Sequence, residues 1–200
     1  MVPLRLLLRA VGLLLTLEQV AALSCLDEQG RSVDWWILYK LPKQSTSNHP
    51  VPGLLGEGRA YAFLTSALPN QRWTLSSMPI DDPNSMSGQV RNNSCFTIPS
   101  TLILQTLAPL YSNASSLFHL LYNDEEPHGK TSFTRGHTKG LVLATKDSGS
   151  LWLIHSIPHY PPFPNETYSY PRTGQRYGQT AMCVSTNSKR WVAIFLIHQI

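Results

Sequence analysis

Charged residues are scarce in this chain of 200 residues, where they make up 14% of the sequence against about 25% in an average soluble domain. Acidic residues are the rarer kind, 12 against 16 basic residues, so the formal net charge is +4. Hydrophobic residues make up 42%, which excludes a disordered tail, and the missing Gly-X-Y and heptad repeats exclude collagen and a coiled coil. The composition therefore predicts one folded domain whose basic excess and seven histidines favour polyanionic partners in acid, such as nucleic acid or anionic lipid headgroups.

Cysteine is scarce as well, with three residues at Cys25, Cys95 and Cys183. Three cysteines allow one intramolecular disulfide and leave one thiol over. Their wide spacing argues against a zinc site.

Motifs for nucleotide binding and serine hydrolysis are missing. There is no Walker loop, no Gly-x-Gly-x-x-Gly after a strand and no Gly-x-Ser-x-Gly elbow. Carboxylates fit to hold Mg²⁺ or Ca²⁺ are also hard to find, because residues 124–126 read as an acidic surface run and residues 81–82 precede a proline in a turn. We therefore expect no metal and no cofactor.

Residues 1–22 are predicted to be a secretory signal peptide. Arg5 and Arg9 lie in or beside an apolar run whose uninterrupted core is about eight residues, far short of the roughly 20 needed to span a bilayer. The small side chains of Val20 and Ala22 predict cleavage after residue 22. The alternative, an uncleaved anchor, is disfavoured because Arg9 splits the apolar stretch, so we expect no stable membrane insertion.

Three Asn-x-Ser/Thr sequons also indicate entry into the secretory pathway, and they lie at Asn92, Asn113 and Asn165. In a chain that enters the secretory pathway they predict N-glycans, and they place these three segments on the surface. A lumenal or secreted glycoprotein is therefore expected.

The hydrophobic pattern predicts a mixture of strands and one helix. Apolar and β-branched runs bounded by turn residues predict strands at 33–39, 61–65, 117–122, 140–145, 151–156 and 181–185, of which 33–39 and 117–122 read as buried. A short helix is predicted at 101–111 despite its proline, and a loop at 43–58. The segment 146–150 has the length and the glycine of a β-hairpin loop between two of these strands.

The sequence His137-Thr138-Lys139, between Gly136 and Gly140, leads into the first strand of this hairpin. Strand side chains alternate, so the histidine and the lysine are expected on one face. An imidazole can attack phosphorus or carry a proton, an ammonium two residues away neutralises phosphate oxygens, and the glycines let a large anion approach closely. A metal-independent phosphodiesterase is favoured over a metal-dependent nuclease. The alternative for so short a motif is a solvated turn.

His155 is a second candidate, because it ends the apolar strand and the hairpin brings it to the same end of the sheet as His137. The alternative is a partly buried, hydrogen-bonded histidine that supports the site. Surface or packing roles are expected for the other histidines, His49, His119, His128, His159 and His198.

Several short blocks stand in the order seen in the deoxyribonuclease II family, and most closely resemble its alpha type. They cover most of residues 23–185 and comprise Cys25, Val33-Asp34-Trp35-Trp36, Tyr39-Lys40-Leu41-Pro42, Leu121-Tyr122-Asn123-Asp124, Arg135-Gly136-His137-Thr138-Lys139-Gly140, Trp152-Leu153-Ile154-His155-Ser156-Ile157-Pro158, Tyr177-Gly178-Gln179-Thr180 and Cys183. The resemblance implies a lysosomal acid endonuclease, reached by the secretory pathway or secreted, that cuts double-stranded DNA without a metal and leaves 3′-phosphate ends.

The family also implies a fold and a site. The fold is an α/β, phospholipase D-like sandwich with a mixed β-sheet, whose site joins two His-x-Lys motifs from two halves of the chain. His137 matches the first catalytic histidine, Lys139 the phosphate-binding lysine, and His155 a histidine near the site. By the same matching Cys25 pairs with Cys183, which stabilises the domain by about 3 to 5 kcal/mol.

Two departures from the family bear on activity. Residues 90–105, with Cys95 as the unpaired thiol, look like an insertion, and residues 186–200 no longer follow the family. We therefore expect residues 23–185 to be the first of two family halves, without the second motif.

One histidine cannot both attack phosphorus and protonate the leaving oxygen of the same phosphodiester. A homodimer, in which two copies of His137 face each other, would supply the partner. The alternative is a catalytically inactive secreted or lysosomal chain that at most binds DNA or competes with the full-length enzyme. A phospholipase D-like lipid hydrolase is the least favoured hypothesis, because the matching blocks are those of the deoxyribonuclease II family.

Overall fold

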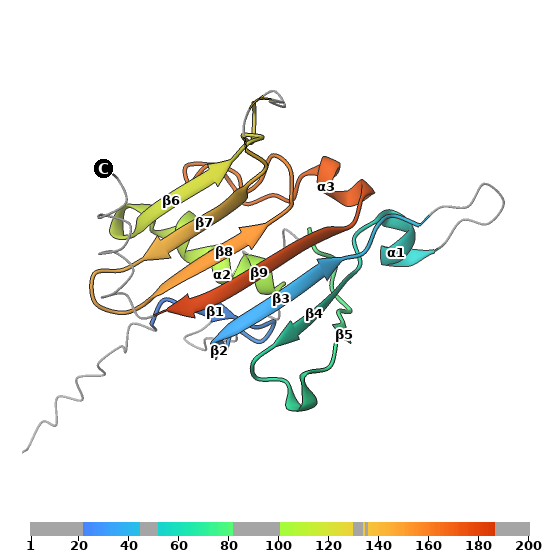
Figure 1. Ribbon diagram of the computed structural model, residues 1–200, viewed down its shortest axis with the longest axis horizontal. Helices are drawn as coiled ribbons and strands as arrows, with labels where there is room; N and C mark the ends of the chain where they lie inside the picture. The colour runs from blue at the N-terminus through green and yellow to red at the C-terminus, as the bar shows by residue number, and fades with distance from the viewer. Residues whose placement is uncertain (1–21, 45–51, 82–100, 130–133, 135, 187–200) are drawn as a thin grey trace, which may run out of the picture.

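A seven-stranded sheet organises the chain in this computed structural model, which describes residues 22–44, 52–81, 101–129, 134 and 136–186 (Figure 1). The strands follow the order β5-β4-β3-β9-β8-β7-β6 across the sheet. Their bounds are β3 Trp35–Lys40, β4 Tyr61–Thr65, β5 Thr74–Leu75, β6 Phe118–Asn123, β7 Lys139–Ala144, β8 Ser150–His155 and β9 Gln179–Thr186. The last strand in sequence therefore lies in the middle of the sheet.

The predicted strands form where apolar and β-branched residues alternate between two faces. In β3, Trp36 and Leu38 are fully buried, whereas Ile37 between them is only partly covered. The strands predicted at 140–145 and 151–156 pair as the expected hairpin, with Leu141 opposite Leu153. The prediction at 61–65 is confirmed as β4, and that at 181–185 as the core of the longer β9.

Two expectations about the sheet are wrong. Every strand pairing in the described part is antiparallel, so the sheet is not mixed. The physical reason is that β9 inserts between β3 and β8 and runs against both, whereas parallel neighbours would need a crossover between them. The strand predicted as buried at 117–122 is the edge strand β6, and Phe118 and His119 are exposed because no strand covers that side.

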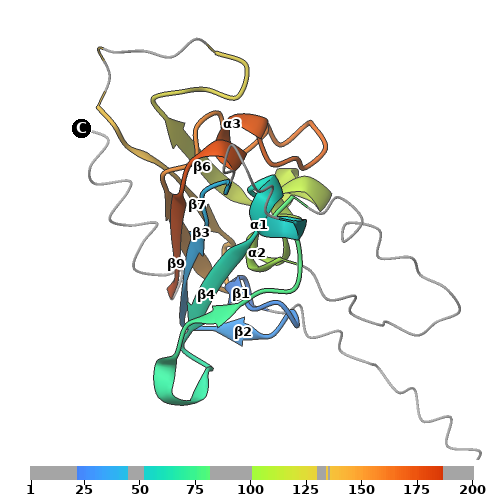
Figure 2. The ribbon, with the colours of Figure 1, turned by 90° about the vertical axis from the view of Figure 1, so that its right-hand side faces the viewer.

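One face of the sheet is covered by α2, Leu102–Ser112, which confirms the helix predicted at 101–111 (Figure 2). The Thr101 hydroxyl accepts a hydrogen bond from the Leu104 backbone N–H at 3.3 Å and so caps the helix. Leu104 and Leu107 pack into the core, and the Trp36 indole donates to the Thr106 hydroxyl at 3.1 Å. The remaining helices are short: α1 Gly53–Glu57, inside the segment predicted as a loop, α3 Arg172–Arg176, and the 3₁₀ turns η1 Pro69–Gln71 and η3 Ala114–Ser116.

A disulfide joins Cys25 to Cys183, with 5.9 Å between the Cα atoms, which confirms the pairing implied by the family. It ties the small two-stranded sheet of β1, Cys25–Leu26, and β2, Ser32–Val33, to the central strand β9. Asn113 and Asn165 are exposed, as a glycosylation site requires. Residues 1–21 of the predicted signal peptide 1–22, together with Asn92, Cys95 and residues 187–200, lie outside the described residues.

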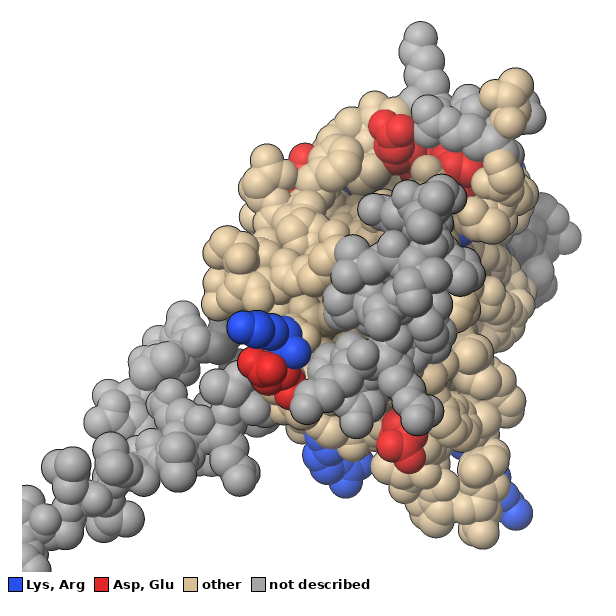
Figure 3. All heavy atoms as spheres, turned by 60° about the vertical axis from the view of Figure 1, so that its left-hand side comes forward, with Lys and Arg blue, Asp and Glu red and all other residues tan. Residues whose placement is uncertain are grey.

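The opposite face of the sheet is apolar and exposed. Ile154 and Met182 face each other across β8 and β9, and their side chains are 37% and 40% exposed. On the side of the molecule drawn in Figure 3, the described Lys and Arg side chains are few and do not gather into a continuous patch. Within the described ranges, no helix combines the length and apolarity needed to cross a bilayer.

Candidate active site

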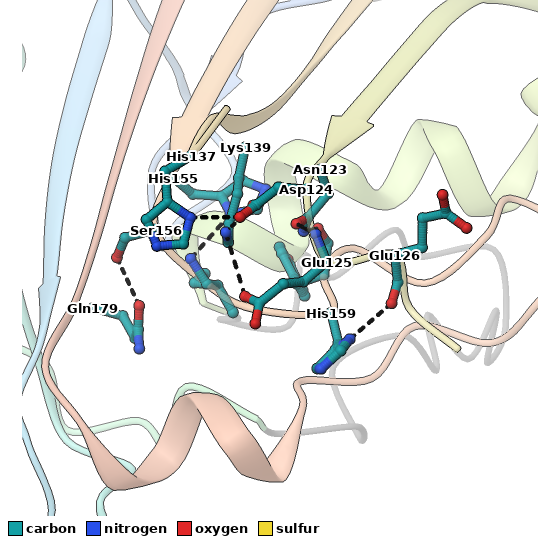
Figure 4. A network of polar contacts seen from close by, with 12 residues as sticks. Asn123, Asp124, Glu125, Glu126, His137, Lys139, His155, Ser156, His159 and Gln179 are labelled. Carbon is teal, nitrogen blue, oxygen red and sulfur yellow. Dashed lines mark hydrogen bonds and ion pairs between the residues drawn. The ribbon is translucent and has the colours of Figure 1, made fainter. Parts of the chain in front are cut away.

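The end of β6 and the start of β7 bring three ionisable side chains together. Asn123, the last residue of β6, pairs with Lys139, the first residue of β7, so the next residue, Asp124, reaches back to both Lys139 and His137. His137 Nδ1 donates to Asp124 Oδ2, and Lys139 Nζ donates to Asp124 Oδ1 (Figure 4). Glu125 adds a second carboxylate, with its Oε2 at 3.3 Å from Lys139 Nζ.

The three side chains differ sharply in exposure. The Asp124 and Lys139 side chains are 1% and 6% exposed, whereas that of His137 is 84% exposed. Burial alone would raise the pKa of Asp124, but the hydrogen bonds and charges of Lys139 and His137 outweigh it and lower that pKa below its ordinary value. Asp124 is therefore a carboxylate that orients His137 through Nδ1, which leaves Nε2 of the exposed ring for a substrate.

Both residues of the His-x-Lys motif thus meet at one point, but not through strand alternation. The strand begins at Lys139, and His137 lies in the segment before it. The carboxylate of Asp124 brings them together instead. The interpretation of residues 124–126 as a surface run is wrong for Asp124, because the register of β6 and β7 buries that residue against Lys139.

Gly140 was expected to leave room for a large anion, but the structure gives another reason for a glycine at this position. A Cβ atom at this position would collide with the Tyr122 hydroxyl and the Leu153 carbonyl oxygen. The Tyr122 hydroxyl is itself held by the indole N–H of Trp152, which donates to it at 2.9 Å. Close packing within the protein, and not room for a ligand, therefore explains Gly140, whereas a Cβ at Gly136 would meet nothing within 4 Å.

His155 ends β8 and is 6% exposed. Its Nδ1 accepts a hydrogen bond from the Ile157 backbone N–H at 3.1 Å, and its ring meets that of Tyr160 edge-on at 5.3 Å. Its Nε2 is buried and has no hydrogen-bond partner among the described residues. Burial, followed by the charge of Lys139, lowers the pKa of His155 to about 3. The ring is therefore neutral, and because Nδ1 accepts, its proton sits on Nε2.

A cavity of about 490 Å³ joins these residues. It is lined by Glu125, His137, Lys139, His155, Ser156, Pro158, His159, Thr173, Tyr177 and Gln179. We call it the reactive cavity. The three predicted site residues His137, Lys139 and His155 all line it.

His159 also lines the reactive cavity, although the sequence assigns it only a surface or packing role. Its backbone has a φ of 53°, a left-handed conformation that a non-glycine residue seldom adopts. Two hydrogen bonds hold it there: the backbone N–H donates to the Glu125 carbonyl at 3.1 Å, and Nδ1 donates to the Glu126 carbonyl at 2.7 Å. Nε2 of His159 is the ring nitrogen left for proton exchange with a bound molecule.

The chain contains one more His-x-Lys sequence, His128-Gly129-Lys130, in a different setting. His128 Nε2 pairs with Glu166 Oε1 at 2.7 Å, and its ring lies 5.8 Å from that of Phe163. Lys130 lies outside the described residues. His128 therefore belongs to a surface contact and not to the reactive cavity.

The residues of the reactive cavity suit a phosphate ester. An exposed imidazole oriented by a carboxylate is a nucleophile or base, and a buried ammonium binds negative charge. The N–H of His155, at the end of β8, is a neutral donor without a partner among the described residues. Among the described residues, no group of three or more His, Cys, Asp or Glu side chains is arranged to hold a metal ion.

Comparison with known proteins points to one family. The model of the deoxyribonuclease II family matches residues 24–198, a range that enters the segment 186–200 for which we expected no resemblance. Human deoxyribonuclease-2-beta is 36% identical over 87% of this chain and 43% of its own length. Pig deoxyribonuclease-2-alpha is 36% identical over 83% of the chain and 40% of its own length.

A third animal relative is covered to a similar extent. Plancitoxin-1 of Acanthaster planci is 34% identical over 82% of the chain and 41% of its own length. The chain therefore spans about two-fifths of the length of the curated relatives it matches. The alpha and beta types match at the same identity of 36%, so the closer resemblance to the alpha type stays a prediction.

Proposed function

This chain belongs to the deoxyribonuclease II family, and from that membership and the geometry of its site we propose that it cleaves phosphodiester bonds of double-stranded DNA. The observation that carries the proposal is the attachment of His137 and Lys139 to the two oxygens of one buried carboxylate, Asp124. This arrangement fixes a nucleophile and a phosphate-binding cation in one cavity.

In the first step, Nε2 of His137 attacks phosphorus and the bond from phosphorus to the 5′ oxygen breaks. The 3′ side of the DNA is then joined to His137 through its phosphate. Asp124 accepts the Nδ1 proton in a hydrogen bond and stabilises the positive ring that results. In the second step, water attacks phosphorus, the bond from nitrogen to phosphorus breaks, and a 3′-phosphate leaves.

The leaving 5′ oxygen needs a proton, and His159 is the residue of the reactive cavity that we assign to supply it. Its Nδ1 is held by the Glu126 carbonyl, so Nε2 of the protonated ring donates to the leaving oxygen. The same nitrogen then takes a proton from the attacking water, which returns both histidines to their starting states. With His159 as the acid, one chain supplies both the nucleophile and the proton donor, and no second copy of the chain is needed.

Two donors hold the non-bridging phosphate oxygens. Lys139 Nζ has three N–H groups, of which Asp124 and Glu125 take two, so the third is left for phosphate. The Nε2–H of His155 is the other donor, because it is neutral and has no acceptor within the described part of the chain. His155 thus binds phosphate and does not carry protons.

The proton donor of this mechanism favours activity in acid. The leaving 5′ oxygen needs a proton donor, whereas Nε2 of His137 has to be unprotonated to attack phosphorus. A supply of protons to the general acid therefore helps the first step, and we expect the enzyme to work in acid. No step of this mechanism uses a metal, so we expect activity in the presence of EDTA.

A plasmid-nicking assay near pH 5 with EDTA tests the function. We expect the protein to nick supercoiled DNA and His137→Ala to lose this activity while keeping DNA affinity. Binding without nicking would instead identify a DNA-binding chain without turnover, and nicking by His137→Ala would overturn the role of His137. The phospholipase D-like relationship, the lysosomal or secreted location, the glycans and the homodimer stay predictions.

A further inference from the structure

A second hollow of about 620 Å³ adjoins the reactive cavity. It lies where α1 and α3 approach each other beyond the end of β3, and we call it the α3 groove (Figure 1). Its lining is Pro42, Lys43, Glu57, Arg172, Gln175, Arg176 and Tyr177. Tyr177 lines both spaces, so the two lie next to each other at the end of α3.

The α3 groove carries positive charge that no described carboxylate neutralises. Lys43, Arg172 and Arg176 are exposed, and within the described ranges none of them forms an ion pair. The carboxylate of the groove, Glu57, is paired with Arg59 Nη1 at 2.9 Å. This contrasts with the reactive cavity, where carboxylates accompany the lysine, and with the sparse charges of the face in Figure 3.

The backbone of α3, which carries two of these cations, is held in place by hydrogen bonds from β3 and the segment after it. The fully buried Lys40 donates from Nζ to the Gln175 carbonyl at 2.5 Å, and the Lys43 backbone N–H donates to the Arg176 carbonyl at 3.1 Å. Gly58, with a φ of 74°, lies so close to the Gln175 carbonyl that a Cβ atom would collide with it. The backbone of α3 therefore needs no ordering when its arginines bind an anion, and the entropy cost falls on the side chains alone.

Tyr177 stands at the boundary of the two spaces with 61% of its surface exposed. The guanidinium of Arg176 lies 5.1 Å from the centre of its ring. An exposed aromatic ring next to a cation is the combination that binds a nucleotide, because the ring stacks on a base or sugar and the cation meets the phosphate. An apolar ligand would leave the cations of this lining without a partner, and a purely ionic ligand would leave the aromatic ring without one.

We infer that the α3 groove holds the DNA strand that leaves the reactive cavity, with Lys43, Arg172 and Arg176 on the flanking phosphates and Tyr177 against a sugar of that strand. The inference rests on the proposed function, because it takes the scissile phosphate to lie at His137. Glu125 lines the reactive cavity but not the α3 groove, and its carboxylate repels a polyanion. The strand is therefore directed toward α3.

Binding and turnover can be separated by experiment. The double variant Arg172→Gln/Arg176→Gln removes two positive charges from the groove, and Arg72→Gln/Lys146→Gln removes two exposed charges elsewhere. Affinity for a duplex oligonucleotide is measured by fluorescence anisotropy at pH 5 between 50 and 200 mM salt, in a His137→Ala background. Turnover of bis(p-nitrophenyl) phosphate is measured with His137 intact.

We expect the groove variant to bind duplex at least about tenfold more weakly near 0.1 M salt. The slope of log affinity against log salt should fall by about 1.8, since each lost phosphate contact contributes about 0.9. The control variant should keep both quantities near those of the wild type. Hydrolysis of the small diester should be unchanged in the groove variant, because this substrate has no flanking strand.

Tyr177 gives an independent test of the same strand. Tyr177→Ala should weaken duplex binding about tenfold without changing the salt slope, because stacking involves no counterion. Tyr177→Trp should retain binding. Equal losses in the alanine and tryptophan variants would contradict a stacking role.

The other possible outcomes test either the α3 groove as a strand site or the proposed nuclease function. Unchanged affinity and salt slope in the groove variant, or equal losses in the control, would overturn the groove as a strand site. A loss of affinity for a heparin oligosaccharide but not for duplex would overturn DNA as its occupant. Absence of diester hydrolysis by the wild type, together with the expected loss of duplex affinity, would reject the proposed function and keep the groove.

Discussion

Lys139 donates from the first residue of β7 to the buried carboxylate of Asp124, the residue that follows β6. The antiparallel register of these two strands therefore buries a charge pair at one end of the sheet. The exposed ring of His137 joins the same carboxylate from the solvent side. One carboxylate after a strand thus joins the proposed nucleophile to the proposed phosphate-binding lysine.

Replacement of that carboxylate should affect activity and stability together. Asp124→Asn keeps the size of the side chain but leaves Lys139 with Glu125 as its carboxylate partner and removes the acceptor that stabilises a positive His137. We expect a loss of plasmid-nicking rate of about 100-fold or more and a decrease of about 3 kcal/mol in the free energy of unfolding.

The exposed Asp147, in the loop between β7 and β8, provides the matched control. Asp147→Asn should change the nicking rate less than twofold and the unfolding free energy by less than about 0.5 kcal/mol. Full activity in Asp124→Asn would show that the carboxylate is not part of the reaction.

The two glycines that flank the motif should respond differently to alanine. Gly140→Ala places a methyl group against the Tyr122 hydroxyl and the Leu153 carbonyl, so overpacking should destabilise the fold by about 1 to 3 kcal/mol. Gly136→Ala meets open space and should be nearly neutral in stability. Urea denaturation of the two variants checks this contrast, and equal stabilities would refute the packing explanation.

His155 should make the fold less stable in acid. Burial lowers its pKa from 6.5 to about 3, so between these values the unfolded chain binds a proton that the native state does not. Stability therefore falls as the pH drops below 6.5, by about 1.4 kcal/mol per unit from this residue. From pH 7 to pH 4.5 the wild type should lose about 2 to 3 kcal/mol more than His155→Gln.

Urea unfolding of both proteins at the two pH values measures this difference. Gln at position 155 carries an amide donor but does not titrate, which separates loss of the hydrogen bond from loss of the proton linkage. The same pH dependence in both proteins would mean that His155 is not held neutral in the native state.

The disulfide should account for much of the stability. Cys25 and Cys183 are 158 residues apart, and opening so long a loop in Cys25→Ser/Cys183→Ser should lower the unfolding free energy by about 3 to 5 kcal/mol. Cys95→Ser is the control and should leave thermal unfolding unchanged. Labelling by iodoacetamide without reductant should modify Cys95 alone, and modification of Cys25 would contradict the bond.

Local features of the fold were predictable because they depend on neighbouring residues. The hairpin of β7 and β8 follows from two apolar strands around a glycine loop, and α2 follows from its apolar spacing after Thr101. The central place of β9 could not be predicted, since strand order depends on contacts between residues far apart in the sequence. The same limit led to the wrong expectation of a mixed sheet.

The site was predictable in its reactive groups but not in what orients them. His137 and Lys139 stand in a short motif, whereas Asp124 lies in an acidic run of a kind usually found on surfaces. Its burial depends on the register of β6 against β7. His159 reaches the reactive cavity through a left-handed backbone conformation that no sequence pattern signals.

Detection of the covalent intermediate on His137 is the sharpest test of the proposed nucleophile. DNA labelled at its 5′ end is mixed with enzyme at pH 5, quenched in alkaline denaturant to preserve phosphohistidine, and digested for peptide mass spectrometry. We expect DNA joined through its 3′-phosphate to the peptide that contains His137, with no adduct in His137→Ala. Cleavage with no adduct, or with an adduct on another residue, would contradict the role of His137 as nucleophile.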